Sequence, residues 1–321
     1  MPAHTLRVAA VQMACALAEV GKNLSRATAF VEQASAAGAE LVLLPELMPG
    51  GYTLTEAIWD TGESFDGTTT QWLKALAKRL GIFVGTSFLE VEGEDFYDTF
   101  VLATPEGRIA GRVRKNPPAS FEAYFSRAGD DRHWIDTSLG RIGVGICYEN
   151  ALYERYCELQ DAGIDLYLRP FSGASFQAKF PIRQKDVEFL NAALRYGTAE
   201  TARAMGIPVV MSNKVGRLVT KLPAGFPPQD VEFPGFSAVA DSDGRLLSQL
   251  PPGQEGVAIG DVTLDPSRKA KQRALRLHGR WTTAMPWWAF IWPLTQKMGE
   301  RSYRSNLSRK SRARSLAPVD S

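Results

Sequence analysis

Short apolar runs of strand length alternate along this chain with stretches in which apolar residues recur every three or four positions. The runs include residues 6–13, 41–44, 82–88, 142–147, 165–169 and 208–211. Helical stripes between the first three runs are formed by Leu24, Ala27, Val31 and Ala34, and then by Trp72, Leu73, Leu76 and Leu80. This alternation predicts an α/β protein. Periodicity alone allows a doubly wound sheet as readily as two packed sheets.

Local signals indicate where several of these elements end. Thr68 is predicted to cap the second helical stripe, and Gly81 is predicted to end it. Turn residues inside strand-like patterns predict two hairpins, over residues 97–113 and 237–249. The regular pattern ends with residues 257–262.

The cysteine content bounds the class of protein. Cys15, Cys147 and Cys157 are an odd number of residues, far apart, which argues against a disulfide framework and predicts a reducing compartment, the cytoplasm. The histidines show no ligand spacing with the cysteines, so we expect neither a metal site nor another cofactor. The N-terminal residues lack the long apolar segment of a signal peptide, and no apolar run reaches the roughly 18–20 residues that span a bilayer.

Charge is distributed unevenly over a chain whose net charge is only +2. From Asp265 onward there are thirteen Lys or Arg and three Asp or Glu, a local balance of +10 that leaves −8 for the rest of the chain. We therefore predict a main domain over residues 1–265 and a basic extension over residues 266–321. The serine-rich end of the extension is expected to be solvated and flexible rather than a nucleic-acid site.

Cys147 lies where an apolar strand pattern gives way to a helical one. Backbone N–H groups at a helix start favour negative charge, so the pKa of this thiol is expected to be lowered and the thiolate reactive. Read alone, such a cysteine is more often a structural core residue. Two other strand ends reverse that judgement, because Glu46 follows residues 41–44 and Lys115 follows residues 109–113. Each strand thus ends in an ionisable side chain.

Glu46 in LVLLPEL, Lys115 in GRVRKN and Cys147 in GRIGVGICYEN together resemble the Glu-Lys-Cys triad of the nitrilase, or carbon–nitrogen hydrolase, superfamily. Glu122 lies where many members carry a second glutamate, seven residues after the lysine. The resemblance extends from about residue 6 to about residue 262. It implies a four-layer α-β-β-α sandwich, with residues 1–265 as the catalytic domain, and assembly into homodimers or higher homo-oligomers.

The three side chains also predict a mechanism. Cys147 would attack a carbon joined to nitrogen and form a thioester. Glu46 would act as general base, with a pKa that burial raises and a nearby lysine lowers. Lys115 and the backbone N–H of Tyr148 would stabilise the oxyanion. Glu122 is expected to orient Lys115 or the substrate amine.

Aromatic residues beside the triad indicate where a substrate would bind. We predict that Tyr52, Tyr148 and Phe121 line the pocket, because each follows or adjoins a motif residue. The expected substrate is a small-molecule amide or N-carbamoyl compound. Nitrile hydrolysis and N-acyl transfer by the same triad are alternatives, although Cys147-Tyr148-Glu149 departs from the Cys-Trp-Glu of many nitrilases. A non-catalytic binding protein that retains the fold is the alternative from another class.

The basic extension contains the segment WTTAMPWWAFIWPL, residues 281–294, which holds four of the seven tryptophans. It is too short to span a membrane. Tryptophan flanked by basic residues is favoured at a membrane interface, so a peripheral membrane contact is one interpretation. We favour the other, in which the rings pack across a dimer interface or over the catalytic domain.

Overall fold

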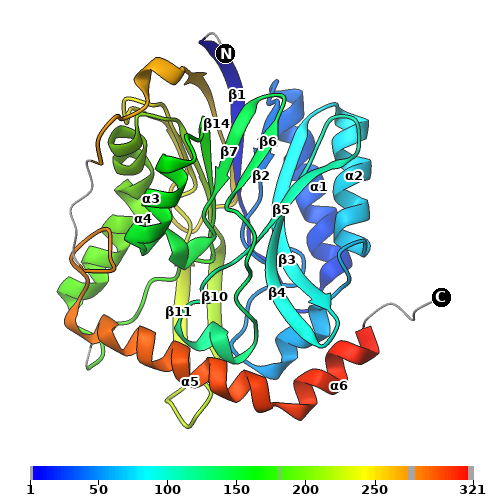
Figure 1. Cartoon of the computed structure of the whole chain (residues 1–321), viewed down its shortest axis with the longest axis vertical. Helices are drawn as coiled ribbons and strands as arrows, with labels where there is room; N and C mark the ends of the chain where they lie inside the picture. The colour runs from blue at the N-terminus through cyan, green and yellow to red at the C-terminus, as the bar shows by residue number, and fades with distance from the viewer. Residues whose placement is uncertain (1–2, 181, 274–278, 317–321) are drawn as a thin grey trace.

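Two six-stranded sheets packed face to face form the centre of the molecule, and helices cover their outer faces (Figure 1). The computed structural model describes residues 3–180, 182–273 and 279–316. The strands of the first sheet, in spatial order, are β14 (Gly256–Leu264), β1 (His4–Gln12), β2 (Leu41–Leu43), β3 (Phe83–Glu92), β4 (Asp95–Ala103) and β5 (Ile109–Arg114). Neighbours β1, β2 and β3 are parallel, and the remaining pairs are antiparallel.

The second sheet repeats this arrangement. Its strands, in spatial order, are β13 (Leu246–Gln249), β12 (Ala238–Ala240), β9 (Val209–Ser212), β8 (Leu166–Pro170), β7 (Gly140–Val144) and β6 (Trp134–Thr137). Here β7, β8 and β9 form the parallel centre. A separate two-stranded ribbon of β10 (Val215–Thr220) and β11 (Gln229–Pro234) was not predicted from the sequence.

The outer layers are α1 (Val20–Ala36) and α2 (Thr68–Leu80) on the first sheet, and α3 (Tyr153–Asp161) and α4 (Gln184–Met205) on the second. The predicted α1 stripe of Leu24, Ala27, Val31 and Ala34 is buried against the first sheet. Side chains from the inner faces of both sheets form one core between them. The four-layer α-β-β-α prediction is therefore confirmed, and the alternative of a doubly wound sheet is excluded.

One predicted helix cap is wrong. Gly67, not Thr68, is the N-cap of α2, and it makes no side-chain cap. Instead the Glu63 carboxylate accepts the backbone N–H of Thr69 at 2.8 Å. A residue that precedes the helix thus pairs with one of the N–H groups that lack a partner in its first turn. Gly81 ends the helix in a left-handed conformation, as predicted.

The extension contains helices where the sequence pattern indicated none. After η4 (Pro266–Arg268), residues 287–316 form η5 (Trp287–Phe290), α5 (Ile291–Ser305) and α6 (Leu307–Leu316), which lie along one end of the molecule (Figure 1). The backbone N–H of Phe96 donates to the Tyr303 hydroxyl at 2.8 Å, and buried Arg309 pairs with Asp95 at 2.6 Å. Residues 307–316, expected to belong to a solvated and flexible end, form the helix α6, which makes ion pairs with acidic residues between positions 60 and 95.

Gly299 brings α5 against the short helix η2 (Ser120–Tyr124), which carries Glu122. A Cβ at this position would lie 2.8 Å from backbone atoms of Ala123 and Tyr124. We expect Gly299→Ala to lower the free energy of unfolding by about 1–3 kcal/mol through overpacking, measured by urea denaturation. Gly21→Ala in α1 is the matched control, because nothing lies within 4 Å of its added Cβ. Equal stability of the two variants would contradict docking of α5 here.

Candidate active site

The predicted catalytic residues come together where strands of the two sheets end. Glu46 follows β2 and Lys115 follows β5, both in the first sheet. Cys147 follows β7 of the second sheet and begins the short helix η3 (Cys147–Ala151). Glu122 is the third residue of η2. The site therefore lies between the sheets, and each sheet supplies part of it.

Lys115 is fully buried and links two carboxylates. Its Nζ donates to Glu46 Oε1 at 2.5 Å and to Glu122 Oε2 at 2.6 Å. Burial favours the neutral amine, but the Glu122 and Glu46 charges outweigh it and hold the pKa of Lys115 well above its usual value. Burial favours the neutral acid and so raises the pKa of Glu46. The Lys115 charge outweighs this effect, and the pKa of Glu46 lies below its usual value. At neutral pH Glu46 is therefore a carboxylate and Lys115 an ammonium.

Asp98, in β4, is a third buried carboxyl that the sequence analysis missed. Its Oδ2 lies 3.7 Å from Lys115 Nζ. Burial, together with the neighbouring Glu46 charge, raises the pKa of Asp98 well above its usual value, and Asp98 in turn lowers the pKa of Glu46. An acid within the otherwise apolar run 97–103 was the available sequence signal. Asp98 helps to keep Glu46 ionised.

Cys147 occupies a tight elbow, with a positive φ of 48° that non-glycine residues rarely adopt. The Asn150 amide donates to the carbonyls of Gly145 at 2.7 Å and Cys147 at 3.0 Å, which fixes the turn. A Cβ on Gly145 would lie 2.0 Å from the Tyr167 hydroxyl, so only glycine fits two residues before Cys147. Cys147 is a partly buried residue, and its thiol lies near Glu46, Lys115 and Glu122.

The predicted lowering of the Cys147 pKa is wrong. The helix that follows is a single short turn, and β7 ends at Val144 rather than at the cysteine. Burial and the nearby Glu46 carboxylate raise the pKa of the thiol well above its usual value, although Lys115 and the Ser172 backbone N–H oppose them. The free site therefore holds a neutral thiol beside an ionised glutamate.

Buried Glu149 connects the backbone segments that carry Lys115 and Cys147. Its carboxylate accepts the backbone N–H groups of Asn116 at 2.7 Å and Ile146 at 2.6 Å, and it lies 2.7 Å from His133 Nε2. Asn116 follows Lys115, and Ile146 precedes Cys147. The structural role of Glu149 was not foreseen from the sequence, because its partners come from distant parts of the chain.

The three predicted pocket residues differ in their contacts. The Tyr52 hydroxyl donates to Glu122 Oε1 at 2.7 Å, which brings it into the charged cluster. The Tyr148 ring packs on Trp281 and Trp292, each with its centroid 5.8 Å away. Phe121 packs edge to face on Phe226 at 4.9 Å. Substrate binding by these side chains stays a prediction.

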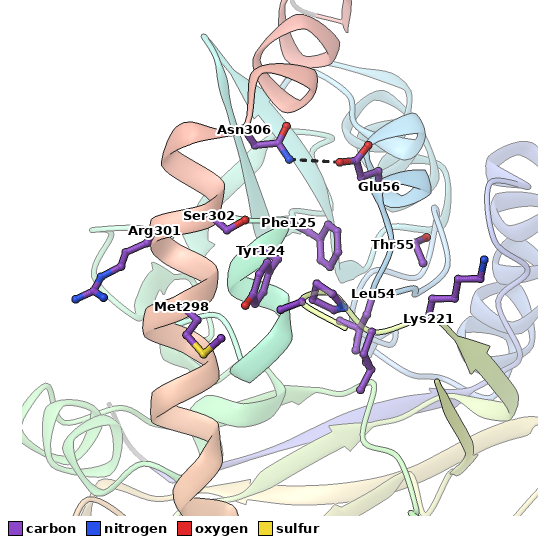
Figure 2. A pocket seen from close by; sticks show the side chains of 13 residues that line it. Leu54, Thr55, Glu56, Tyr124, Phe125, Lys221, Met298, Arg301, Ser302 and Asn306 are labelled. Atoms are coloured by element: carbon purple, nitrogen blue, oxygen red, sulfur yellow. Dashed lines mark hydrogen bonds between the residues drawn. The ribbon is translucent and has the colours of Figure 1, made fainter. Parts of the chain in front are cut away.

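Two further features lie beside the cluster. Lys214 is a second buried lysine, with its Nζ 3.3 Å from the Leu47 carbonyl oxygen and 5.6 Å from the Tyr52 ring centroid. A groove of about 600 Å³, lined in part by Tyr124, Phe125 and Met298, opens between α5 and the turn of the β10–β11 ribbon (Figure 2). Within the described ranges, no cluster of His, Cys, Asp and Glu could hold a metal ion.

The fold is that of a known class of hydrolytic enzymes. The chain has a TM-score of 0.71 with a carbon-nitrogen hydrolase structure from Helicobacter pylori G27, at 20% identity over 95% of this chain and 96% of that one. Residues 7–272 match the family model for carbon-nitrogen hydrolases. The chain belongs to the carbon-nitrogen hydrolase family and is a hydrolytic enzyme, which confirms the resemblance seen in the sequence.

Named relatives fall into two functional groups. The chain is 26% identical to an N-carbamoylputrescine amidase from Solanum lycopersicum, over 80% of this chain and 86% of the relative. It is 28% identical to a nitrilase from Pyrococcus abyssi, over 81% and 90% respectively. Residues 266–321 are more than a sixth of the chain. The likeness to the Helicobacter pylori structure over 95% must therefore include part of the extension.

Proposed function

We propose that this enzyme hydrolyses the carbon–nitrogen bond of an amide or N-carbamoyl compound through a thioester on Cys147. The observation that carries the proposal is the buried Lys115 cation, bonded to both Glu46 and Glu122 beside the thiol. A cation held at this place can stabilise an oxyanion, and an ionised glutamate can accept the thiol proton. The amidase and nitrilase relatives support carbon–nitrogen chemistry.

In the first half-reaction, Cys147 Sγ attacks the carbonyl carbon while Glu46 accepts the thiol proton. The oxyanion of the tetrahedral adduct faces Lys115, with the backbone N–H of Tyr148 as a second donor. The carbon–nitrogen bond then breaks, and Glu46 returns the proton to the leaving nitrogen. The products of this stage are ammonia or an amine and an acyl or carbamoyl thioester.

In the second half-reaction, Glu46 removes a proton from water, whose oxygen attacks the thioester carbon. The carbon–sulfur bond breaks, and Glu46 returns the proton to the thiolate. An acid is released, which is a carboxylic acid from an amide and a carbamic acid from an N-carbamoyl substrate. Glu122 holds Lys115 in place throughout. The raised pKa of Cys147 fits this sequence, because the thiol keeps its proton until Glu46 removes it.

The test is intact-mass spectrometry of rapidly quenched mixtures of the enzyme with amides, N-carbamoyl compounds and nitriles. We expect an acyl or carbamoyl adduct on the peptide that contains Cys147, with an amide or N-carbamoyl substrate turned over fastest. An added amine tests the alternative of acyl transfer, since a transferase would convert it to a new amide. An adduct on Cys15 or Cys157 alone, or no adduct and no turnover with any compound, would contradict the proposal.

We also propose a cytoplasmic location and a homo-oligomeric state. The first is supported by three cysteines that are all free thiols in the structure. The second is supported by the family resemblance, and sedimentation velocity of the full chain measures it directly. Among the described residues no helix is long and apolar enough to cross a membrane.

A further inference from the structure

The outer face of the α5 region carries a row of large apolar side chains that the domain does not cover. Trp287, Phe290, Ile291, Leu294 and Met298 are 55%, 77%, 39%, 59% and 37% exposed. Their spacing of three or four residues places them on one side of the helix. We call these five residues the apolar stripe. The domain packs against α5 through Thr295, Gly299 and Tyr303, and it leaves the stripe largely uncovered.

Three exposed cations lie on the same helix. Lys297, Arg301 and Arg304 have no acidic partner within 4 Å among residues 3–180, 182–273 and 279–316. The arginines of α6 behave differently, since Arg309, Arg312 and Arg314 pair with Asp95, Asp60 and Glu94. The cations of α5 therefore remain available to an external anion, whereas those of α6 are bound to the catalytic domain.

We propose that the apolar stripe and the three α5 cations bind the surface of a bilayer that contains anionic lipids. A helix with an apolar face, tryptophan and phenylalanine on that face and nearby Lys or Arg is the pattern of a segment that lies in a membrane interface. Attraction between these cations and anionic headgroups adds to the burial of the apolar side chains. The helix would lie in the plane of the interface without crossing it.

The same cations argue against a second copy of the chain as the occupant. A two-fold symmetric contact through the stripe would set α5 against a second α5, which carries the same three cations, Lys297, Arg301 and Arg304. The helix offers a copy of itself a single carboxylate, that of Glu300, which forms no ion pair with these cations among the described residues. An anionic surface complements the helix, whereas its own copy does not.

The position of the stripe links this surface to the catalytic end of the molecule. Met298 and Arg301 also line the groove between α5 and the turn of the β10–β11 ribbon (Figure 2). On the buried side, Trp292 packs against Tyr148, the residue after Cys147. A bilayer bound to the stripe would thus lie beside the groove and one helix away from the site.

Co-sedimentation of the full chain with vesicles tests the proposal. We expect binding to vesicles of phosphatidylcholine mixed with phosphatidylglycerol, weaker binding to pure phosphatidylcholine, and loss of binding as salt is raised. The triple variant Lys297→Gln, Arg301→Gln, Arg304→Gln should bind about fivefold more weakly for each charge removed. The variant Trp287→Ser, Phe290→Ser, Leu294→Ser should lose binding, because these exposed side chains supply the apolar contact.

The matched control is Lys22→Gln, Lys78→Gln, Arg108→Gln, which removes three exposed cations from elsewhere on the domain. This control should bind vesicles like the wild type, and urea denaturation checks that every variant folds. The proposal would be overturned if the wild type did not sediment with anionic vesicles. It would also be overturned if the control lost as much vesicle binding as the triple variant of the α5 cations. Sedimentation velocity that shows a dimer lost in the serine variant, without vesicle binding, would assign the stripe to a second copy.

Discussion

Replacement of Cys147 by alanine is expected to abolish turnover while the fold is retained. The variant lacks the thiol that lies beside Glu46 and Lys115, so no thioester forms. Removal of a catalytic nucleophile from a cooperating set reduces kcat by about 10⁴-fold or more. Cys147 is only partly buried and loses a single sulfur atom, so little cavity is left. Steady-state kinetics on the preferred amide or N-carbamoyl substrate measures the effect, and urea denaturation measures the stability.

Cys15→Ala and Cys157→Ala are the matched controls, because each removes a thiol of the same size that does not act on Glu46 or Lys115. Both variants should keep most of the wild-type activity. If Cys147→Ala retained more than a few per cent of activity, the nucleophile would be another group. The same conclusion would follow if only Cys15→Ala or Cys157→Ala were inactive.

Elements with a clear local period were predicted well from the sequence. The α1 stripe of Leu24, Ala27, Val31 and Ala34 is buried as expected, since helical spacing places these residues on one face. The strands before Glu46 and Lys115 were recognised from short apolar runs bounded by polar residues. The resemblance then supplied what periodicity could not, namely that these strand ends belong to two packed sheets.

The helices of the extension were missed because apolar residues lie on two sides of the segment where they begin. Trp288 and Trp292 pack on the domain, while Trp287 and Phe290 are exposed, so the segment does not show the single buried stripe of α1. Pro293 also lies within the first turn of α5, where proline is tolerated although it reads as a helix breaker. The tryptophans were predicted to pack across a dimer interface or over the catalytic domain. Trp281 and Trp292 pack on Tyr148 of that domain, whereas Trp287 is exposed.

The protonation states of the site depend on contacts between residues far apart in the chain. The sequence places Cys147 next to a helix start, which predicts a lowered pKa, but it does not show that Glu46 lies beside the thiol. Asp98 and Lys214 were missed for the same reason, since each is a single polar residue within or next to a strand. The strand order of the first sheet brings Asp98 beside Glu46, and the packing of the second sheet against it adds Cys147 and Lys214.

Replacement of Lys115 by glutamine is expected to lower kcat by a factor of about 10²–10³ or more, because a preorganised cation facing the oxyanion is lost. The variant also leaves Glu46 and Glu122 buried without their shared cation. The pKa of Glu46, which Lys115 lowers in the wild type, should therefore rise, since the largest charge that opposes burial is gone. The free energy of unfolding should fall by about 3–5 kcal/mol.

The pH profile distinguishes a catalytic cation from one that only binds substrate. In the wild type the lowered pKa of Glu46 keeps the base ionised as the pH falls towards the usual range of glutamate. In Lys115→Gln the raised pKa means that the base is protonated at a higher pH, so the acid limb of kcat/KM should move upward. Urea denaturation confirms that the variant is folded at the assay temperature. A higher KM with unchanged kcat and an unmoved acid limb would show that Lys115 contributes only to ground-state binding.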